Sequence, residues 1–157
     1  MGHWFQRNRI LLFGKNMENN FKFQNINIGH QTIISEKIFS SSQVNAFQNS
    51  QGDSGMPNKL TSKKFARQHG LPGPLVPGAM SIAYISRHLN DTMPETRIKK
   101  LDIIFRRSVK QETSILASAI IVDKYIFMDK EIIECDVFLK DLTLSPLVIG
   151  KATIEFP

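Results

Sequence analysis

The sequence predicts an α+β domain in which a curved antiparallel sheet wraps around one central helix. Three observations lead to this prediction: one early strand, a helix that is apolar on every face, and a series of alternating strands that follows it. The early strand covers residues 32 to 39, the helix residues 78 to 90, and the later strands run from residue 100 to the end. A chain of 157 residues is the size of one domain with one hydrophobic core.

Composition indicates a globular chain. Hydrophobic residues make up 41% and charged residues 22%, which excludes disorder throughout. No stretch approaches the roughly 20 apolar residues of a membrane-spanning helix. Lys and Arg exceed Asp and Glu by 20 to 14, a net charge of +6, which favours acidic or phosphate-bearing partners. The basic residues are scattered and no zinc-finger spacing occurs, so specific nucleic-acid binding is not expected.

The cysteine content points to a reducing compartment. Cys135 is the only cysteine, so neither an internal disulfide nor a cysteine-based zinc site can form, and a cytoplasmic location is expected. Residues 1 to 16 carry basic residues and no acid, and we interpret them as an appendage to a domain covering residues 17 to 157. An upstream start codon before Met17 is favoured over a short basic targeting or membrane-touching arm.

The N-terminal half predicts a strand and two short helices. An extended lead-in from Phe21, with a turn at Gly29, precedes the strand. Ser40 to Gln43 supply an N-cap with a capping box for a helix near residues 42 to 49. Thr61 or Ser62 caps a second helix, KKFARQH, which ends at Gly70.

The central helix and the strands follow. Residues 71 to 78, LPGPLVPG, form a stiff approach, and residues 79 to 86 are apolar or small on every face, so protein is expected to surround the first two turns. Beyond it the strands are expected to form an antiparallel meander with hairpins near residues 129–130 and 142–146. The apolar positions on their inner faces are Leu101, Ile103, Phe105, Val109, Ile133, Cys135, Val137, Leu139, Val148, Ala152, Ile154 and Phe156, and residues 113 to 123 are almost continuously apolar.

Several of these segments together resemble one family. FQNINIGHQTIISEKIFSSSQVNAFQNSQGD, FARQHGLPGPLVPGAMSIAYISRHL and LDIIFRRSV are similar to the MaoC-like, or (R)-specific enoyl-thioester hydratase, branch of the hotdog-fold superfamily. The match runs from about Phe21 to Phe156, and Ser108 stands where the family usually has proline. The resemblance implies the hotdog fold, with a curved antiparallel sheet around a central buried helix.

The resemblance also implies a site. Hydration of an enoyl thioester needs a base for water and donors for the negative charge on the thioester oxygen. Asp53 matches the family's catalytic Asp, and Gly78 matches the residue whose N–H at the start of the helix serves as oxyanion donor. The family's histidine has no counterpart between Asp53 and Ala66, so the catalytic segment is degenerate and the site remodelled. Residues that could bind substrate or replace the histidine are Ser54, Asn58, His69, Pro77 and Ser81.

Other histidines and other reactions stay open. His69 is otherwise a helix-end residue favoured by the helix dipole, His88 is expected to be structural, and His30 to face solvent. The function expected first is an acyl-thioester hydratase or dehydratase, a hydro-lyase of fatty acid or polyketide metabolism. The alternatives are a non-catalytic acyl-thioester-binding subunit, or a thioesterase or cyclase acting on a carrier-bound intermediate.

The resemblance suggests partners as well. The expected partner is the acyl thioester of coenzyme A or acyl carrier protein, with no other cofactor and no metal. A homodimer, or a heterodimer with a related hotdog subunit, is expected because a lone small sheet leaves its edges unpaired.

Overall fold

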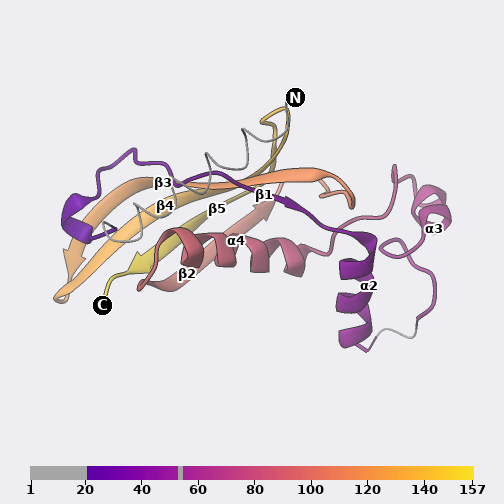
Figure 1. The fold of residues 1–157 in the computed structure, drawn as a ribbon, viewed down its shortest axis with the longest axis horizontal. Coiled ribbons are helices and arrows are strands. Elements are labelled where there is room, and N and C mark those ends of the chain that lie inside the picture. The colour runs from indigo at the N-terminus through magenta and orange to yellow at the C-terminus, as the bar shows by residue number, and fades with distance from the viewer. Residues whose placement is uncertain (1–20, 53–54) are drawn as a thin grey trace, which may run out of the picture.

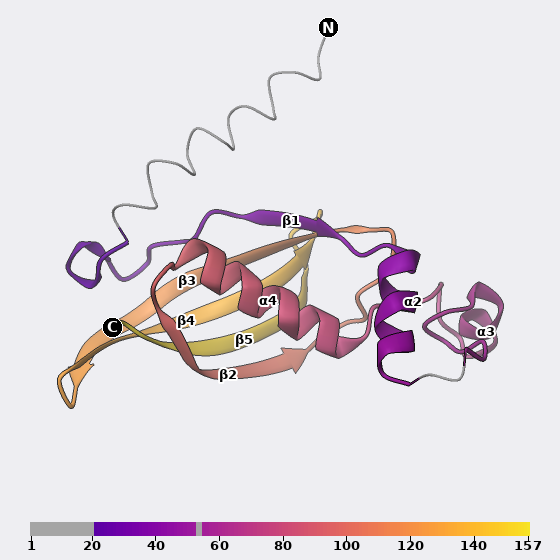
Figure 2. The ribbon, with the colours of Figure 1, turned by 60° about the horizontal axis from the view of Figure 1, so that its bottom comes forward.

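Five antiparallel strands form one curved sheet in the order β1-β3-β4-β5-β2. The computed structural model describes residues 21–52 and 55–157, so the predicted appendage of residues 1 to 16 lies outside the described residues. Helix α4 lies along one face of the sheet, and α2 and α3 lie beyond its N-terminal end (Figure 1; Figure 2). The elements are η1(Phe23–Asn25), β1(Ser35–Ile38), α2(Ser41–Ser50), α3(Lys63–Gln68), α4(Gly78–Thr92), β2(Arg97–Phe105), β3(Ser114–Phe127), β4(Lys130–Asp141) and β5(Pro146–Glu155). This arrangement confirms the predicted α+β class.

The predicted meander of the later strands is wrong in the position of its first strand, β2. β3, β4 and β5 are consecutive neighbours, as expected, but β2 does not precede β3 in the sheet. It pairs with β5, with Leu101 opposite Ala152, while β1 pairs with β3, with Lys37 opposite Ile115. Helix α4 carries the chain from the β1 edge to the β2 edge (Figure 2). Period-two alternation says which face of a strand is buried and nothing about its neighbour, which is why the sequence misplaced β2.

On β4 and β5 the buried face of the sheet follows the predicted alternation, whereas Phe105 of β2, also expected on the inner face, is 48% exposed. Ile133, Cys135, Val137 and Leu139 on β4 are at most 1% exposed, and Val148, Ala152 and Ile154 on β5 are equally buried. The two predicted hairpins are present. The first turns at Met128 and Asp129, which both have left-handed φ angles of 49° and 60°, and the carboxylate of Asp141 accepts hydrogen bonds from the backbone N–H of Thr143 and Ser145 in the second. Side-chain period and local turn chemistry therefore fixed this half of the sheet.

Both short helices begin where their capping residues predict. The Ser40 hydroxyl accepts from the Gln43 N–H, and the Gln43 side chain accepts from the Ser40 N–H, so the capping box of α2 is complete. Of the two candidate caps of α3, Ser62 is the one used, because its hydroxyl accepts from the Phe65 N–H. Gly70 follows α3 with a φ of +73°, a conformation that costs glycine little.

Helix α4 begins at Gly78 as predicted and ends at Thr92, two residues later than expected. The expectation that protein surrounds its first two turns is wrong for the single chain. Ser81, Ile85, His88 and Leu89 face the sheet and are buried, whereas Ala79, Ile82 and Ala83 are exposed. A single sheet covers only one side of a helix, so the small and apolar residues of the other side stay uncovered. Within the described residues, no helix has the length and apolar character to cross a membrane.

The lead-in to β1 runs along β3. Gly29, with a φ of +88°, donates its N–H to the Ile121 carbonyl at 2.7 Å, and the Thr32 N–H donates to the Ala119 carbonyl at 2.9 Å. The regular strand is shorter than predicted, covering residues 35 to 38. These bonds place Thr32 and Ser35 over the middle of α4, where they become part of a polar cluster.

Candidate functional site

The N-terminus of α4 is open to a ligand. Pro77 is the N-cap and has no side chain that can accept a hydrogen bond, so no side chain caps the helix. The first N–H groups of an uncapped helix carry partial positive charge and lack intrahelical partners. Gly78 is the first helical residue, and a Cβ there would lie 3.0 Å from Cζ of Phe105. Glycine therefore lets the Phe105 ring lie directly against the start of the helix.

A cavity of about 390 Å³ opens at this end of α4. The hydroxyl of Ser81 belongs to it: Ser81 is fully buried, and no group in the described residues is bonded to its Oγ. A buried hydroxyl without a partner costs free energy unless a ligand or water satisfies it. The cavity is lined by Leu75, Val76, Gly78, Ser81, Phe105, Arg106, Arg107, Ser108 and Val109.

Two arginines line the cavity, one of them in an ion pair. Arg107 is held in place, because its guanidinium bonds the Asp141 carboxylate and the Pro146 carbonyl, both at 3.3 Å. The pKa of Asp141 is lowered chiefly by the hydrogen bond from the Thr143 hydroxyl, so the carboxylate that holds Arg107 is charged at neutral pH. Arg106 lines the same cavity and is exposed. Because Arg107 is paired with Asp141, it is the helix end and Arg106 that favour an anion or an oxygen that gains negative charge.

The other residues expected at the site lie in several places. Asp53 and Ser54 lie outside the described residues. The side-chain oxygen of Asn58 accepts from the Leu60 N–H at 2.8 Å and shapes the turn before α3. His69 is exposed, donates from Nδ1 to the Phe65 carbonyl at 2.9 Å and stacks on the Phe65 ring. The structure thus brings Gly78 and Ser81 together in the cavity, whereas Asn58, His69 and the N-cap residue Pro77 do not line it.

One residue that the sequence analysis did not single out ties this region together. The Gln111 side chain donates to the carbonyl of Leu60 at 2.6 Å and to the carbonyl of Leu75 at 2.8 Å. It is 9% exposed, and its amide anchors the segment before α3 to the approach to α4. A glutamine in a loop carries no sequence signal of its own that predicts such a role.

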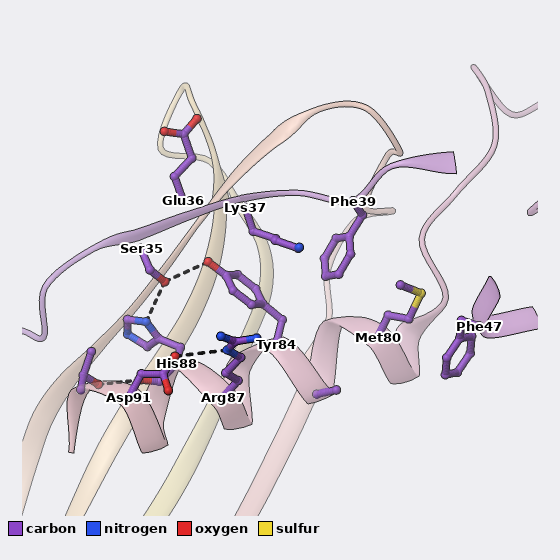
Figure 3. A pocket seen from close by; sticks show the side chains of 12 residues that line it. Ser35, Glu36, Lys37, Phe39, Phe47, Met80, Tyr84, Arg87, His88 and Asp91 are labelled. Carbon is purple, nitrogen blue, oxygen red and sulfur yellow. Dashed lines mark hydrogen bonds and ion pairs between the residues drawn. The ribbon is translucent and has the colours of Figure 1, made fainter. Parts of the chain in front are cut away.

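A second cavity, of about 620 Å³, lies between β1 and α4. Figure 3 shows Ser35 and Lys37 of β1 and Tyr84, Arg87 and His88 of α4 around it. His88 is 3% exposed, with Nε2 2.9 Å from the Thr32 hydroxyl and Nδ1 2.8 Å from the Ser35 hydroxyl. The Tyr84 hydroxyl lies 2.9 Å from that of Ser35. Burial lowers the pKa of His88 to about 4 and raises the pKa of Tyr84, so both are neutral at pH 7.

These contacts give His88 two hydroxyl partners and leave it buried, as a structural histidine would be. The sequence analysis missed Thr32, Ser35 and Tyr84. The available signal was the spacing of Tyr84 and His88, since residues four apart share one helix face. Across residues 21–52 and 55–157, no three His, Cys, Asp or Glu side chains gather in a way that could hold a metal ion.

Solved structures with the same arrangement of strands and helix identify the fold. The (R)-hydratase from A. caviae involved in PHA biosynthesis matches with a TM-score of 0.73 at 19% identity, over 85% of this chain and 99% of that one. The R-hydratase PhaJ1 from Pseudomonas aeruginosa matches with a TM-score of 0.75 at 18% identity, over 88% and 86%. The chain has the hotdog fold.

A further solved structure is also similar. The HadBC complex, a 3R-hydroxyacyl-ACP dehydratase from Mycobacterium tuberculosis, matches with a TM-score of 0.63 at 11% identity, over 82% of this chain and 96% of that one. A comparison with protein-family models and with curated protein sequences finds no match. The structural neighbours of this hotdog chain thus include (R)-hydratases and a MaoC-like dehydratase, as the sequence resemblance suggested.

Proposed function

We propose that this hotdog chain is an acyl-thioester hydratase or dehydratase of the MaoC-like kind, with a remodelled active site at the N-terminus of α4. The observation that carries the proposal is the cavity at Gly78, where an uncapped helix end and the unpartnered Ser81 hydroxyl meet. Such a place suits the carbonyl oxygen of a thioester, which becomes negative when water adds to the conjugated double bond. The neighbours named as hydratases and dehydratases support the same reaction class.

The reaction assigns a task to each group. Asp53 takes a proton from water, the hydroxyl oxygen bonds to C3, and the electron pair of the double bond moves to give an enolate. The N–H of Gly78 stabilises the enolate oxygen, and the proton is delivered to C2, so that one water is added in total. Ser54, Asn58, His69, Pro77 and Ser81 are proposed substrate contacts or replacements for the missing histidine.

The carrier is proposed to be coenzyme A or acyl carrier protein. Arg106 and Arg107 line the cavity, and the chain carries a net charge of +6, so a phosphate-bearing carrier would be attracted to this region. A reducing, cytoplasmic setting suits the buried free thiol of Cys135.

Turnover of enoyl thioesters tests the proposal. Purified protein is incubated with crotonyl-coenzyme A and with longer enoyl thioesters, and loss of the enoyl absorbance is followed. Asp53→Asn should abolish turnover, because the amide keeps the size of the side chain and cannot accept the proton. Asp129→Asn, at the exposed tip of the β3–β4 hairpin, is the matched control and should keep full activity. Unchanged turnover in Asp53→Asn would remove Asp53 from the mechanism, and release of free thiol would indicate thioester hydrolysis instead.

A non-catalytic subunit is the second candidate. Of the described histidines, His30, His69 and His88, none lines the cavity at Gly78, and loss of an acid–base group costs about 10²- to 10⁴-fold in rate. In that case the chain would bind the thioester beside a competent partner. The purified chain would then show no hydration alone, whatever the acyl length.

Either candidate is proposed to act as a dimer, with itself or with a related hotdog chain. β2 is a nine-residue edge strand on which Ile104 and Phe105 are 52% and 48% exposed. Unpaired edges of this length are normally covered. A neighbour, HadBC, is itself a complex. Sedimentation at micromolar concentration should give a dimer for the chain alone or with its partner, and a monomer under both conditions would contradict the pairing.

A further inference from the structure

The cavity between β1 and α4 is separate from the proposed thioester site. It is lined on α4 by Met80, Tyr84, Arg87 and Asp91, which share one helix face, whereas Gly78 and Ser81 line the other cavity. The two cavities have no lining residue in common. Its volume of about 620 Å³ falls in the range of roughly 300–1,000 Å³ that is typical of small-molecule sites.

The hydrogen bonds around His88 leave one donor for a ligand. The Thr32 hydroxyl accepts from the Ala119 N–H at 2.8 Å, and its own hydrogen has His88 Nε2 as its acceptor among the described residues. A neutral imidazole that accepts at Nε2 carries its hydrogen on Nδ1. We therefore assign the hydrogen to Nδ1, which then donates to the Ser35 hydroxyl, because the other tautomer would leave the buried Thr32 hydroxyl hydrogen without an acceptor among the described residues.

Ser35 and Tyr84 then have one hydroxyl hydrogen each, and a single hydrogen bond of 2.9 Å joins the two hydroxyl oxygens. One hydrogen fills that contact, and the other is left over. Both residues line the cavity and are half-buried, and Figure 3 shows their hydroxyl groups meeting at its wall. The cluster thus presents one O–H donor, which calls for an oxygen acceptor on the ligand.

Charged side chains of both signs lie around that donor. Ser35, Glu36 and Lys37 of β1 all line the cavity, with Lys37 half-buried and Glu36 exposed. Lys37 makes no ion pair in the described part of the chain. Arg87 lies on the other side of the Tyr84 hydroxyl and is paired with Asp91 at 3.3 Å. Arg87 is paired with Asp91, and Glu36 is exposed to water, so the half-buried charge of the lining is that of Lys37, which favours a ligand carrying a single negative charge.

The rest of the wall is apolar. Phe39 is 5% exposed, and with Phe47 of α2 and Met80 of the first turn of α4 it lines the end of the cavity away from His88 (Figure 3). An aliphatic chain laid against these side chains would be removed from water. The head group would thus lie at Ser35 and Tyr84, and the tail would run past Phe39, whose ring centroid is 5.9 Å from that of Tyr84, toward Phe47 and Met80.

We propose that this cavity binds a medium-chain fatty acid, with its carboxylate at Tyr84, Ser35 and Lys37 and its chain against Phe39, Phe47 and Met80. This inference goes beyond the proposed function and does not rest on it, because the ligand is a free acid and the site is not the one at Gly78.

The test is a titration of the full-length protein at pH 7.5 with decanoate that carries ¹³C at its carboxylate. Calorimetry measures the affinity, and the ¹³C chemical shift reports whether the carboxylate is bound. Saturable one-site binding with a shifted carboxylate signal is expected. Decylamine, with the same chain and the opposite charge, should bind at least tenfold more weakly.

Variants locate the site. Tyr84→Phe keeps the ring and removes the hydroxyl, and it should weaken decanoate binding by about tenfold, since hydrogen bonds to charged groups are worth about that much. Lys37→Met should weaken it similarly. Tyr125→Phe is the matched control, because Tyr125 lies on β3 and bonds Glu134 outside the cavity; its affinity should be that of the natural chain. Far-ultraviolet circular dichroism checks that each variant folds. Equal affinity for decanoate and decylamine, or unchanged affinity in folded Tyr84→Phe, overturns the proposal.

Discussion

Acidification should destabilise the fold through His88. Burial lowers the pKa of this imidazole from 6.5 to about 4, so between these values the unfolded chain binds a proton that the folded chain does not. The contribution of His88 to stability is therefore fully present above the unfolded pKa and is lost as the pH falls from about 6.5 toward 4. A difference of about 2.5 pH units corresponds to about 3 kcal/mol in total, of which about 2 kcal/mol is lost by pH 5.

Urea denaturation at pH 7.0 and pH 5.0 measures this loss. Carboxylates stabilised in the fold, such as Asp141, contribute in the same direction, so His88→Gln serves as the reference. This variant should be less stable at pH 7.0, because Thr32 and Ser35 lose the partner they have in the natural chain. Its stability should fall by about 2 kcal/mol less than that of the natural chain between the two pH values. Equal losses in the two proteins would show that His88 takes up its proton in the folded state, and would refute the burial argument.

The remaining predictions concern packing, reactivity and capping. Gly150→Ala should lower the free energy of unfolding, measured by urea denaturation, by more than about 3 kcal/mol. The added Cβ would overlap the Asp102 carbonyl oxygen and lie 2.7 Å from a methyl carbon of Ile103. Gly73→Ala is the control and should cost far less, because the space around Gly73 is open. Cys135 is fully buried, and burial raises the pKa of its thiol to about 12. The thiol should therefore resist alkylation at pH 8 until urea unfolds the protein, which mass spectrometry would measure. Rapid labelling of the folded protein would contradict this prediction. Ser40→Ala should cost about 1 kcal/mol through loss of the cap, and thermal melts that match those of the natural chain would argue against it.

The sequence by itself determined the local structure of this protein. Period-two alternation identified the buried faces of β4 and β5, and side chains that bond their own neighbourhood fixed the start of α2 at Ser40 and of α3 at Ser62. Gly78 was predicted as the first residue of α4 and is. These features depend on residues a few positions apart, so they can be read along the chain.

Only the tertiary structure decided which elements are neighbours. It placed β2 against β5 and left one side of α4 uncovered, and neither is encoded by the period of the strands or of the helix. It also brought Thr32 and Ser35 to His88, across 56 and 53 positions of sequence. The histidine could be predicted to be structural, but its partners could not. A hydroxyl becomes a specific partner only when folding removes the water that would otherwise bond it, and which hydroxyl that is depends on how the lead-in to β1 crosses the middle of α4.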